Sequence, residues 1–250
     1  MHASKDKDFA LAIEGLTVSF DGFKAVDDLS LYVDDNEIRV IIGPNGAGKT
    51  TVLDLICGRT KADAGSIVFK GKDLTKMKEN QIVQAGVGRF FQNPSVYEDL
   101  TVYENLELSY PRGRSVFGSL FFRPDAALVE RVTAVAETIF LADHLQDIAG
   151  ELSHGQKQWL EIGMLLVQDP ALMMLDEPVA GMSVSERRQT AELLHQIIQD
   201  RSVIVVEHDM SFVADIAHRV TVMHQGSVLS EGSMQHVQSD ARVKEVYLGH

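Results

Sequence analysis

A phosphate-binding pattern, G-x-x-x-x-G-K-[ST], occupies residues 43–50 of the sequence. The glycines of such a loop allow backbone N–H groups to turn inward around a chain of phosphates. Lys49 is expected to reach the β- and γ-phosphates, and the Thr50 hydroxyl is expected to bind Mg²⁺. A helix that starts at the end of the loop would add the positive end of its dipole. We therefore assign nucleotide contacts to Gly43, Pro44, Asn45, Gly46, Ala47, Gly48, Lys49, Thr50 and the adjoining Thr51.

An acidic pair, Asp176-Glu177, closes the apolar run Ala171–Leu175. The C-terminal end of a parallel strand lies beside a phosphate-binding loop, so Asp176 can hold Mg²⁺ there through water. Glu177 is the next residue and is placed to polarise an attacking water molecule. The alternatives are an ordinary glycine-rich turn for the loop and a surface acidic pair for the two carboxylates. Their occurrence together favours a site at which water attacks a bound phosphate chain.

Buried strands and the helices between them are expected to position both patterns. Ile38–Ile42 is a continuous apolar run, as in a strand buried on both faces, and it leads directly into the loop. A helix is expected from about Gly48 to Ile56. Further strand patterns, with helical patterns between them, lie at Leu172–Leu175, Val203–Val206 and Val220–Met223. This alternation predicts a largely parallel sheet with helices on both faces.

Two other regions depart from this alternation. Alternating apolar residues at Leu11–Phe20 and Val26–Val33, on either side of Asp21-Gly22, predict an antiparallel β-ribbon. Helical patterns from about Val102 to Gln168, clearest over Glu130–Phe140, predict a helical insertion. Shorter strands are expected at Ser66–Phe69 and Val87–Phe91.

Length and charge limit the classes of protein to which this chain can belong. Its 250 residues suffice for one well-buried α/β domain with an insertion, but are short for two full domains. The net charge of -13 would repel a nucleic-acid backbone, so no nucleic-acid partner is expected. The single cysteine, Cys57, cannot form an internal disulfide, which fits a reducing cytosol. No apolar run approaches the roughly 20 residues that span a bilayer, so we expect any membrane role to be peripheral. Residues 1–8 are charged and polar, so no secretory signal is expected there.

The segment Leu152-Ser153-His154-Gly155-Gln156 resembles the signature motif of the ATP-binding cassettes of ABC transporters. It begins a helical pattern and precedes the Asp176-Glu177 strand, as in that family, and the resemblance covers nearly the whole chain. It implies an α/β fold: a P-loop NTPase cassette with a RecA-like parallel-sheet core, an N-terminal antiparallel β subdomain and an inserted α-helical subdomain. Residues 1–250 would form one domain, with 1–91 and 169–250 as β subdomain and catalytic core and 92–168 as helical subdomain.

The same resemblance implies a composite site. In the family two cassettes pack head to tail, and the signature of one covers the γ-phosphate held by the phosphate-binding loop of the other. This role would fall to Ser153, Gly155 and Gln156, because a hydroxyl and backbone N–H groups at a helix start suit an anion. A serine that merely caps a helix is the alternative. The implied cofactors are ATP and Mg²⁺, and the implied activity is ATP hydrolysis.

Three further residues match family positions that act on the nucleotide. Gln92 matches the glutamine that links Mg²⁺ and the attacking water to the helical insertion, and His208 matches the switch histidine at the γ-phosphate. Taken alone, each would be an ordinary polar residue after a strand. Phe20 matches the aromatic residue that stacks on adenine, although Phe23 competes for that position and either could belong to the core. The expected catalytic residues are therefore Lys49, Gln92, Glu177 and His208, and the expected metal ligands are Thr50, Gln92 and Asp176.

Two positions depart from the family pattern. The third residue of the signature is usually glycine, and here it is His154, whose side chain should point away from the phosphate if the site is functional. The loop after Glu177 usually ends in aspartate, whereas this chain has Ser183. Ser183 and Glu186 form an S-x-x-E pattern that predicts a capped helix start. The role that the missing aspartate plays across the pair of cassettes is open.

The segment Phe91–Tyr97 resembles cassettes of the importers for branched-chain amino acids and their relatives. The segment Leu152–Met164 resembles most closely one ATP-binding subunit of the urea importers in that group. The implied partners are a second cassette, membrane permease subunits and, indirectly, a periplasmic or extracellular solute-binding protein. The second cassette is expected to be a distinct paralogue, with a homodimer as the alternative. The implied location is cytoplasmic, on the inner face of the cell membrane. Urea is the expected solute; the alternatives are a branched-chain amino acid importer, a soluble ABC ATPase without a transport role and a regulatory cassette that does not hydrolyse ATP.

Overall fold

The computed structural model describes residues 9–90, 96–111 and 126–248, which form two compact units. The first unit comprises Met1–Arg89, Ala171–Glu177 and His195–His250, and the second comprises Phe90–Pro170 and Pro178–Leu194. The predicted helical subdomain, 92–168, falls within the second unit, together with 178–194, which the sequence analysis placed in the core.

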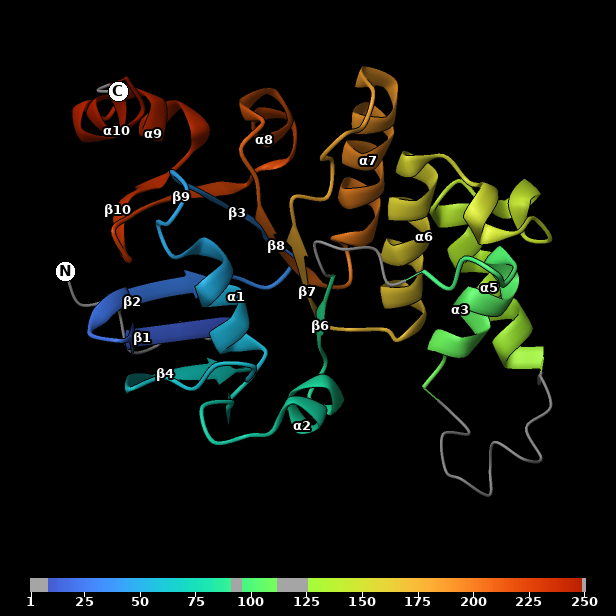
Figure 1. Cartoon of the computed structure of the whole chain (residues 1–250), viewed down its shortest axis with the longest axis horizontal. Helices are drawn as coiled ribbons and strands as arrows, with labels where there is room; N and C mark the ends of the chain where they lie inside the picture. The colour runs from blue at the N-terminus through green and yellow to red at the C-terminus, as the bar shows by residue number, and fades with distance from the viewer. Residues whose placement is uncertain (1–8, 91–95, 112–125, 249–250) are drawn as a thin grey trace. The chain divides into compact units, whose positions relative to one another are not determined.

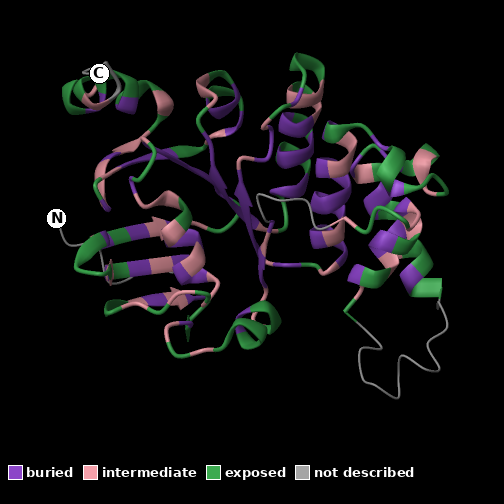
Figure 2. Cartoon of the chain, in the orientation of Figure 1, coloured by how far each residue is buried: buried purple, intermediate pink, exposed green. Residues whose placement is uncertain are grey.

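A six-stranded sheet in the first unit carries the strands that lead to the phosphate-binding pattern and the acidic pair (Figure 1). In β6, β7, β8, β3 and β9 neighbouring strands pair in parallel, and β10 joins β9 antiparallel. Every residue of β3, β7 and β8 is buried, which explains their nearly unbroken apolar sequences (Figure 2). The predicted parallel core is thus confirmed, and the antiparallel edge strand was not predicted. The strand order is β10 (Ser227–Gly232), β9 (Arg219–His224), β3 (Ile38–Ile42), β8 (Ser202–Val206), β7 (Leu172–Asp176) and β6 (Val87–Arg89).

An antiparallel sheet of four strands lies in the same unit (Figure 1). Asp21 and Gly22 connect its first two strands in a tight turn with φ values of 49° and 85°, which suits these residue types. The predicted β-ribbon is confirmed, and its second strand begins earlier, at Phe23. The strand order is β2 (Phe23–Val33), β1 (Leu11–Phe20), β4 (Ala64–Phe69) and β5 (Lys72–Asp73).

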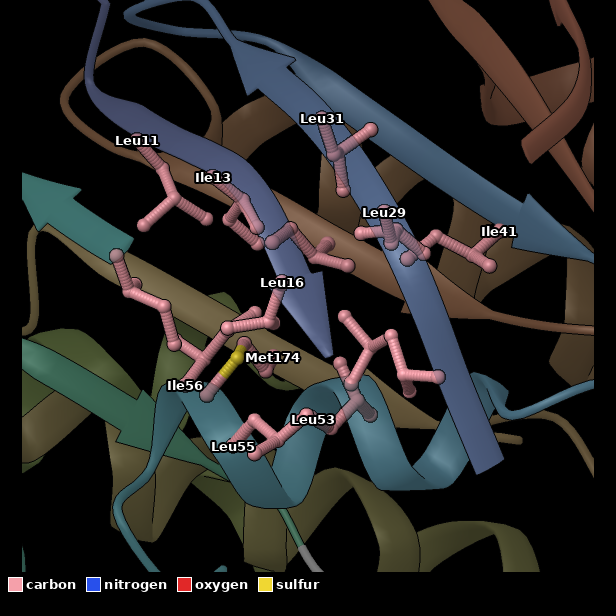
Figure 3. Close-up of a cluster of buried hydrophobic side chains, with 14 of the residues drawn as sticks. Leu11, Ile13, Leu16, Leu29, Leu31, Ile41, Leu53, Leu55, Ile56 and Met174 are labelled. Carbon is pink, nitrogen blue, oxygen red and sulfur yellow. The ribbon is translucent and has the colours of Figure 1, made fainter. Parts of the chain in front are cut away.

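Helix α1 (Lys49–Ile56) is held by the hydrophobic core of the first unit (Figure 3). Its buried side chains Leu53 and Ile56 join a cluster that includes Leu16 of β1 and Met174 of β7. Burying a large apolar side chain of this kind stabilises the fold by about 1.5–3 kcal/mol. The phosphate-binding loop is therefore fixed at one end by a buried strand, β3, and at the other by a helix whose apolar face is buried in the core.

The other helices that lie wholly in the first unit have six to eight residues, no more than the eight of α1. Helix α8 begins after Asp209, whose Oδ1 accepts hydrogen bonds from the N–H groups of Ser211 and Phe212 at 3.0 and 3.1 Å. Throughout the described part of the chain, no helix is long and apolar enough to cross a membrane. The helices other than α1 that lie wholly in the first unit are α2 (Glu79–Gln84), α8 (Met210–Ile216), α9 (Met234–Ser239) and α10 (Ala241–Leu248).

The described residues of the second unit are mainly helical. The helix predicted over Glu130–Phe140 is α5, which begins earlier and ends at Thr138. Its predicted end was wrong because Phe140 adopts a left-handed conformation, with φ of 60°, that a helix cannot continue through. The elements are α3 (Val102–Ser109), α5 (Ala126–Thr138), the 3₁₀ turns η1 (Ala142–His144) and η2 (Ala149–Glu151), α6 (His154–Val167) and α7 (Val184–Ile197), of which the last three residues belong to the first unit.

Candidate phosphate-binding site

The loop between β3 and α1 has a backbone that only glycine accepts at one critical position. Gly48 immediately precedes α1 and has φ of 97°, a left-handed conformation. A Cβ atom there would also collide with the backbone oxygen of Ala25. The glycine of the sequence pattern therefore lets the loop close against the neighbouring strand. The first N–H groups of α1 have no intrahelical partner, so they are available to an anion.

Lys49 folds back over this loop. Its Nζ donates hydrogen bonds to the backbone oxygens of Gly43 and Pro44 at 2.8 and 3.1 Å. Burial lowers the pKa of Lys49, and the carboxylates of Glu177 and Asp176 oppose that shift. The ammonium is thus pre-positioned within the loop, where a phosphate would gain a charge-assisted hydrogen bond from it.

Asp176 ends β7 and is only 3% exposed. Burial raises the pKa of Asp176; Arg89 opposes that rise, Glu177 adds to it, and a hydrogen bond from the Thr50 side chain lowers the pKa. The structure therefore brings together Thr50 and Asp176, the two described residues that the sequence assigned to Mg²⁺. Within 9–90, 96–111 and 126–248, no group of three or more His, Cys, Asp and Glu side chains forms a metal site of its own.

Glu177 and His208 also meet in the first unit. Glu177 has φ of 53°, and its N–H donates to the Val206 oxygen at 2.9 Å, so the residue turns sharply out of the sheet. Its Oε1 lies 3.5 Å from Nδ1 of His208, whose side chain is 69% exposed. An exposed histidine beside a carboxylate can approach a ligand without disturbing the core.

Arg89 and Glu207 are site residues that the sequence analysis missed. The Arg89 side chain joins Asp54 of α1, at 2.5 Å, to Asp176, at 3.5 Å. Glu207 is 1% exposed, and its Oε2 accepts the N–H groups of His208 and Asp209 at 2.8 and 3.2 Å. Each fixes the backbone or carboxylate of a predicted site residue. A charged residue within or directly after an apolar strand run was the available signal.

Cys57, next to this arginine, is partly buried and packs against the hydrophobic core. Burial raises its pKa to about 11, although Arg89 opposes the shift. The thiol is therefore protonated at neutral pH and behaves as a small apolar residue of the core.

The signature segment lies at the start of α6 in the second unit. Ser153 is the N-cap: its Oγ accepts the Gln156 N–H at 3.2 Å, and Gln156 Oε1 accepts the Ser153 N–H at 2.9 Å. Gly155 is buried against Glu186, with no room for a Cβ atom. Ser153 and His154 are exposed at the helix start. The described geometry suits both a helix cap and an anion-binding helix terminus.

The other predicted positions have different outcomes. Phe20 and Phe23 are paired across the β1–β2 turn and are 48% and 66% exposed, so both aromatic rings are available for stacking. Gln92 lies outside the described residues. Ser183 and Glu186 form the predicted capping box, with the Ser183 N–H donating to Glu186 Oε2 at 2.8 Å and the Glu186 N–H donating to Ser183 Oγ at 3.3 Å.

Comparison with known families and proteins gives a consistent picture. Residues 26–180 match the family model described as ABC transporter. The high-affinity branched-chain amino acid transport ATP-binding protein LivG of Salmonella typhimurium is 34% identical over 96% of this chain and 97% of its own length. A probable LivG of Methanocaldococcus jannaschii is 32% identical over the same shares of the two chains.

Solved structures also resemble the chain over nearly its full length. A nucleotide-free ATP-binding cassette from an ABC transporter matches with a TM-score of 0.86 and 31% identity over 97% of this chain and 100% of that one. The ADP conformation of an ATP-binding cassette of an ABC transporter also matches with a TM-score of 0.86 and 31% identity, over 98% of this chain. Both the sequence and the three-dimensional arrangement thus match over nearly the full length.

Proposed function

We propose that this chain, which belongs to the ABC transporter family as an ATP-binding subunit with ATPase activity, powers a membrane importer. ATP would be hydrolysed at the phosphate-binding site described above. The observation that carries this proposal is that three groups of functional residues lie in one unit. A phosphate-binding loop with Lys49, a buried Asp176 beside Thr50, and Glu177 beside His208 all belong to it.

Each residue has a defined task in this proposal. The N–H groups around Gly48 and the Lys49 ammonium hold the phosphates and balance the charge that develops during transfer. Glu177 orients the attacking water and accepts its proton, and His208 contacts the γ-phosphate. Gln92 is proposed to complete the water site, and Phe20 to stack on the adenine.

Thr50 and Asp176 suit Mg²⁺ as partial ligands. Mg²⁺ in phosphate sites takes one or two protein oxygens and keeps water and phosphate oxygens for its other positions. A hydroxyl and a buried carboxylate in hydrogen-bond contact supply such a pair, and Asp176 already lies beside one cation, Arg89. When bound, the metal ion would neutralise charge on the β- and γ-phosphates.

The signature completes the site from a second cassette. Ser153, Gly155 and Gln156 are proposed to cover the γ-phosphate bound by a partner, so that two nucleotides hold two cassettes together. Hydrolysis removes these shared contacts and lets the pair open. The proposed neighbours are a paralogous cassette or a second copy of this chain, permease subunits at the inner face of the cell membrane, and, through them, a solute-binding protein.

The solute is proposed from likeness alone, because in this family it does not touch the cassette. A branched-chain amino acid is favoured by relatives that are 32–34% identical over nearly the full length. Urea is the second candidate, and its support is the segment Leu152–Met164, which resembles the cassettes of urea importers.

Uptake by cells that carry Glu177→Gln in their own copy of the chain tests both candidates. We expect the variant to abolish uptake of one labelled solute, leucine or urea, and to leave the other unchanged. A matched control is Glu192→Gln on the exposed surface of α7, which should leave the uptake of both solutes at the parental level. Unchanged uptake of both solutes in the Glu177→Gln cells would contradict the proposed role in either importer.

A further inference from the structure

Both departures from the family pattern lie in the second unit. His154 stands at the start of α6, and Ser183 stands at the start of α7; the two helices lie side by side (Figure 1). Trp159 on α6 donates to the Thr190 hydroxyl on α7 at 2.9 Å, which sets their spacing. The loop that joins Glu177 to Ser183 therefore passes along the signature.

His154 is turned onto that loop. Its Nε2 lies 3.0 Å from the backbone oxygen of Ala180, and since a carbonyl only accepts, Nε2 carries the proton. Gln158, one turn further along α6, donates to the same oxygen at 3.3 Å. The loop oxygen thus has two side-chain donors, both from the signature helix.

The next loop residue, Gly181, lies against the imidazole ring of His154. Gly181 has φ of 73°, and a Cβ atom there would lie 3.2 Å from Cδ2 and Nε2 of His154. The ring therefore packs against the glycine backbone as well as bonding to its neighbour. A glycine at position 154 would make neither contact.

The α7 start is tied to the signature in a second place. Glu186, which caps α7 with Ser183, also accepts the Ser153 hydroxyl at 3.5 Å. Hydrogen bonds from Ser183 are the main cause that lowers the pKa of Glu186, so the carboxylate is charged at neutral pH. The loop after Glu177 is consequently held at Ala180 by His154 and at its end by Glu186.

We propose that His154 is a positioning residue that couples the signature of the chain to the loop following its own Glu177. This inference rests on the proposed function, in which the signature serves the ATP of the partner and Glu177 serves the chain's own ATP. A displacement of Ser153 by the partner's γ-phosphate then reaches Glu177 through Ala180 and the two backbone residues between Ala180 and Glu177. The two ATP sites of a pair communicate through this contact.

Three substitutions separate the hydrogen bond from the shape of the ring. His154→Phe keeps a ring but removes the donor, His154→Gln restores a donor at a similar distance from the backbone, and His154→Gly restores the usual family residue. We expect kcat to fall about tenfold in His154→Phe and His154→Gly, with KM for ATP changed less than twofold, since about 1.4 kcal/mol is a factor of ten. The Hill coefficient for ATP hydrolysis should fall to 1 in His154→Phe and His154→Gly, and it should return to the parental value in His154→Gln.

Thermal unfolding would establish whether each variant is folded. The matched control is His236→Phe, which replaces an exposed histidine of α9. Equal kcat, KM and Hill coefficient in the parent, His154→Phe and His154→Gln would overturn the proposal. So would an equal loss in His154→Phe and His154→Gln, because the donor would then be irrelevant. Glu177→Gln, measured in the same assay, keeps the two ideas apart: hydrolysis that survives it defeats the proposed catalytic site itself.

Discussion

Replacing Glu177 by glutamine is expected to lower kcat for ATP hydrolysis by about 10²–10⁴, the contribution typical of a positioned general base. Glutamine has nearly the same size, and the backbone bond from residue 177 to the Val206 oxygen is kept. The substitution removes the proton acceptor and one negative charge near the phosphates. ATP affinity should therefore stay the same or increase.

Phosphate release and equilibrium ATP binding measure the two effects separately. Glu192→Gln, an exposed carboxylate on α7, is the control for loss of one charge and should hydrolyse ATP at the parental rate. A Glu177→Gln chain that hydrolyses at the parental rate would remove this residue from the proposed role. A chain that no longer binds ATP would instead assign Glu177 to binding.

Replacing Lys49 by methionine is expected to weaken ATP binding by a factor of about 30 or more, because losing one partner of a desolvated charge pair typically costs about 2–5 kcal/mol. The Lys49 ammonium donates hydrogen bonds to the Gly43 and Pro44 oxygens, and burial lowers its pKa. Removing this half-buried charge should therefore leave the unliganded fold intact. The expected loss is specific to the bound state.

Thermal unfolding with and without ATP checks this prediction in one experiment. A ligand at 100 times its Kd stabilises a protein by about 2.7 kcal/mol, so the parent should show a clear rise in Tm. The Lys49→Met chain should keep its Tm without ATP and show a much smaller rise than the parent at the same ATP concentration. Lys61→Met, an exposed lysine, should respond to ATP as the parent does. An undiminished rise in Lys49→Met would place the phosphates elsewhere.

The parallel core was predictable because its strands are buried on both faces. Such strands read as continuous apolar runs, and β3, β7 and β8 do so. β10 was not predicted, since it is a half-buried edge strand whose pattern, Ser227–Gly232, has little contrast. The end of α5 was misplaced for a local reason, the left-handed backbone of Phe140, that hydrophobic periodicity does not encode.

The site shows the same division between local and non-local information. Lys49, Thr50, Asp176 and Glu177 lie at fixed offsets from strand ends, so their positions followed from the sequence. Arg89 and Glu207 act through partners on other elements, and their roles needed the fold. The direction of His154 was expected from its proximity to an anion, but its partner, the Ala180 oxygen, is 26 residues away.

The central claim is that one chain's phosphate-binding loop works with another chain's signature, and mixing two inactive variants tests it most directly. Lys49→Met removes the loop function and Ser153→Arg blocks the signature, so each alone should be inactive in phosphate release. Their equimolar mixture should recover activity, up to roughly a quarter of the parental rate, because half of the pairs are mixed and each holds one intact site. A mixture no more active than its two components, with both variants folded and able to pair, would show that the site lies within a single chain.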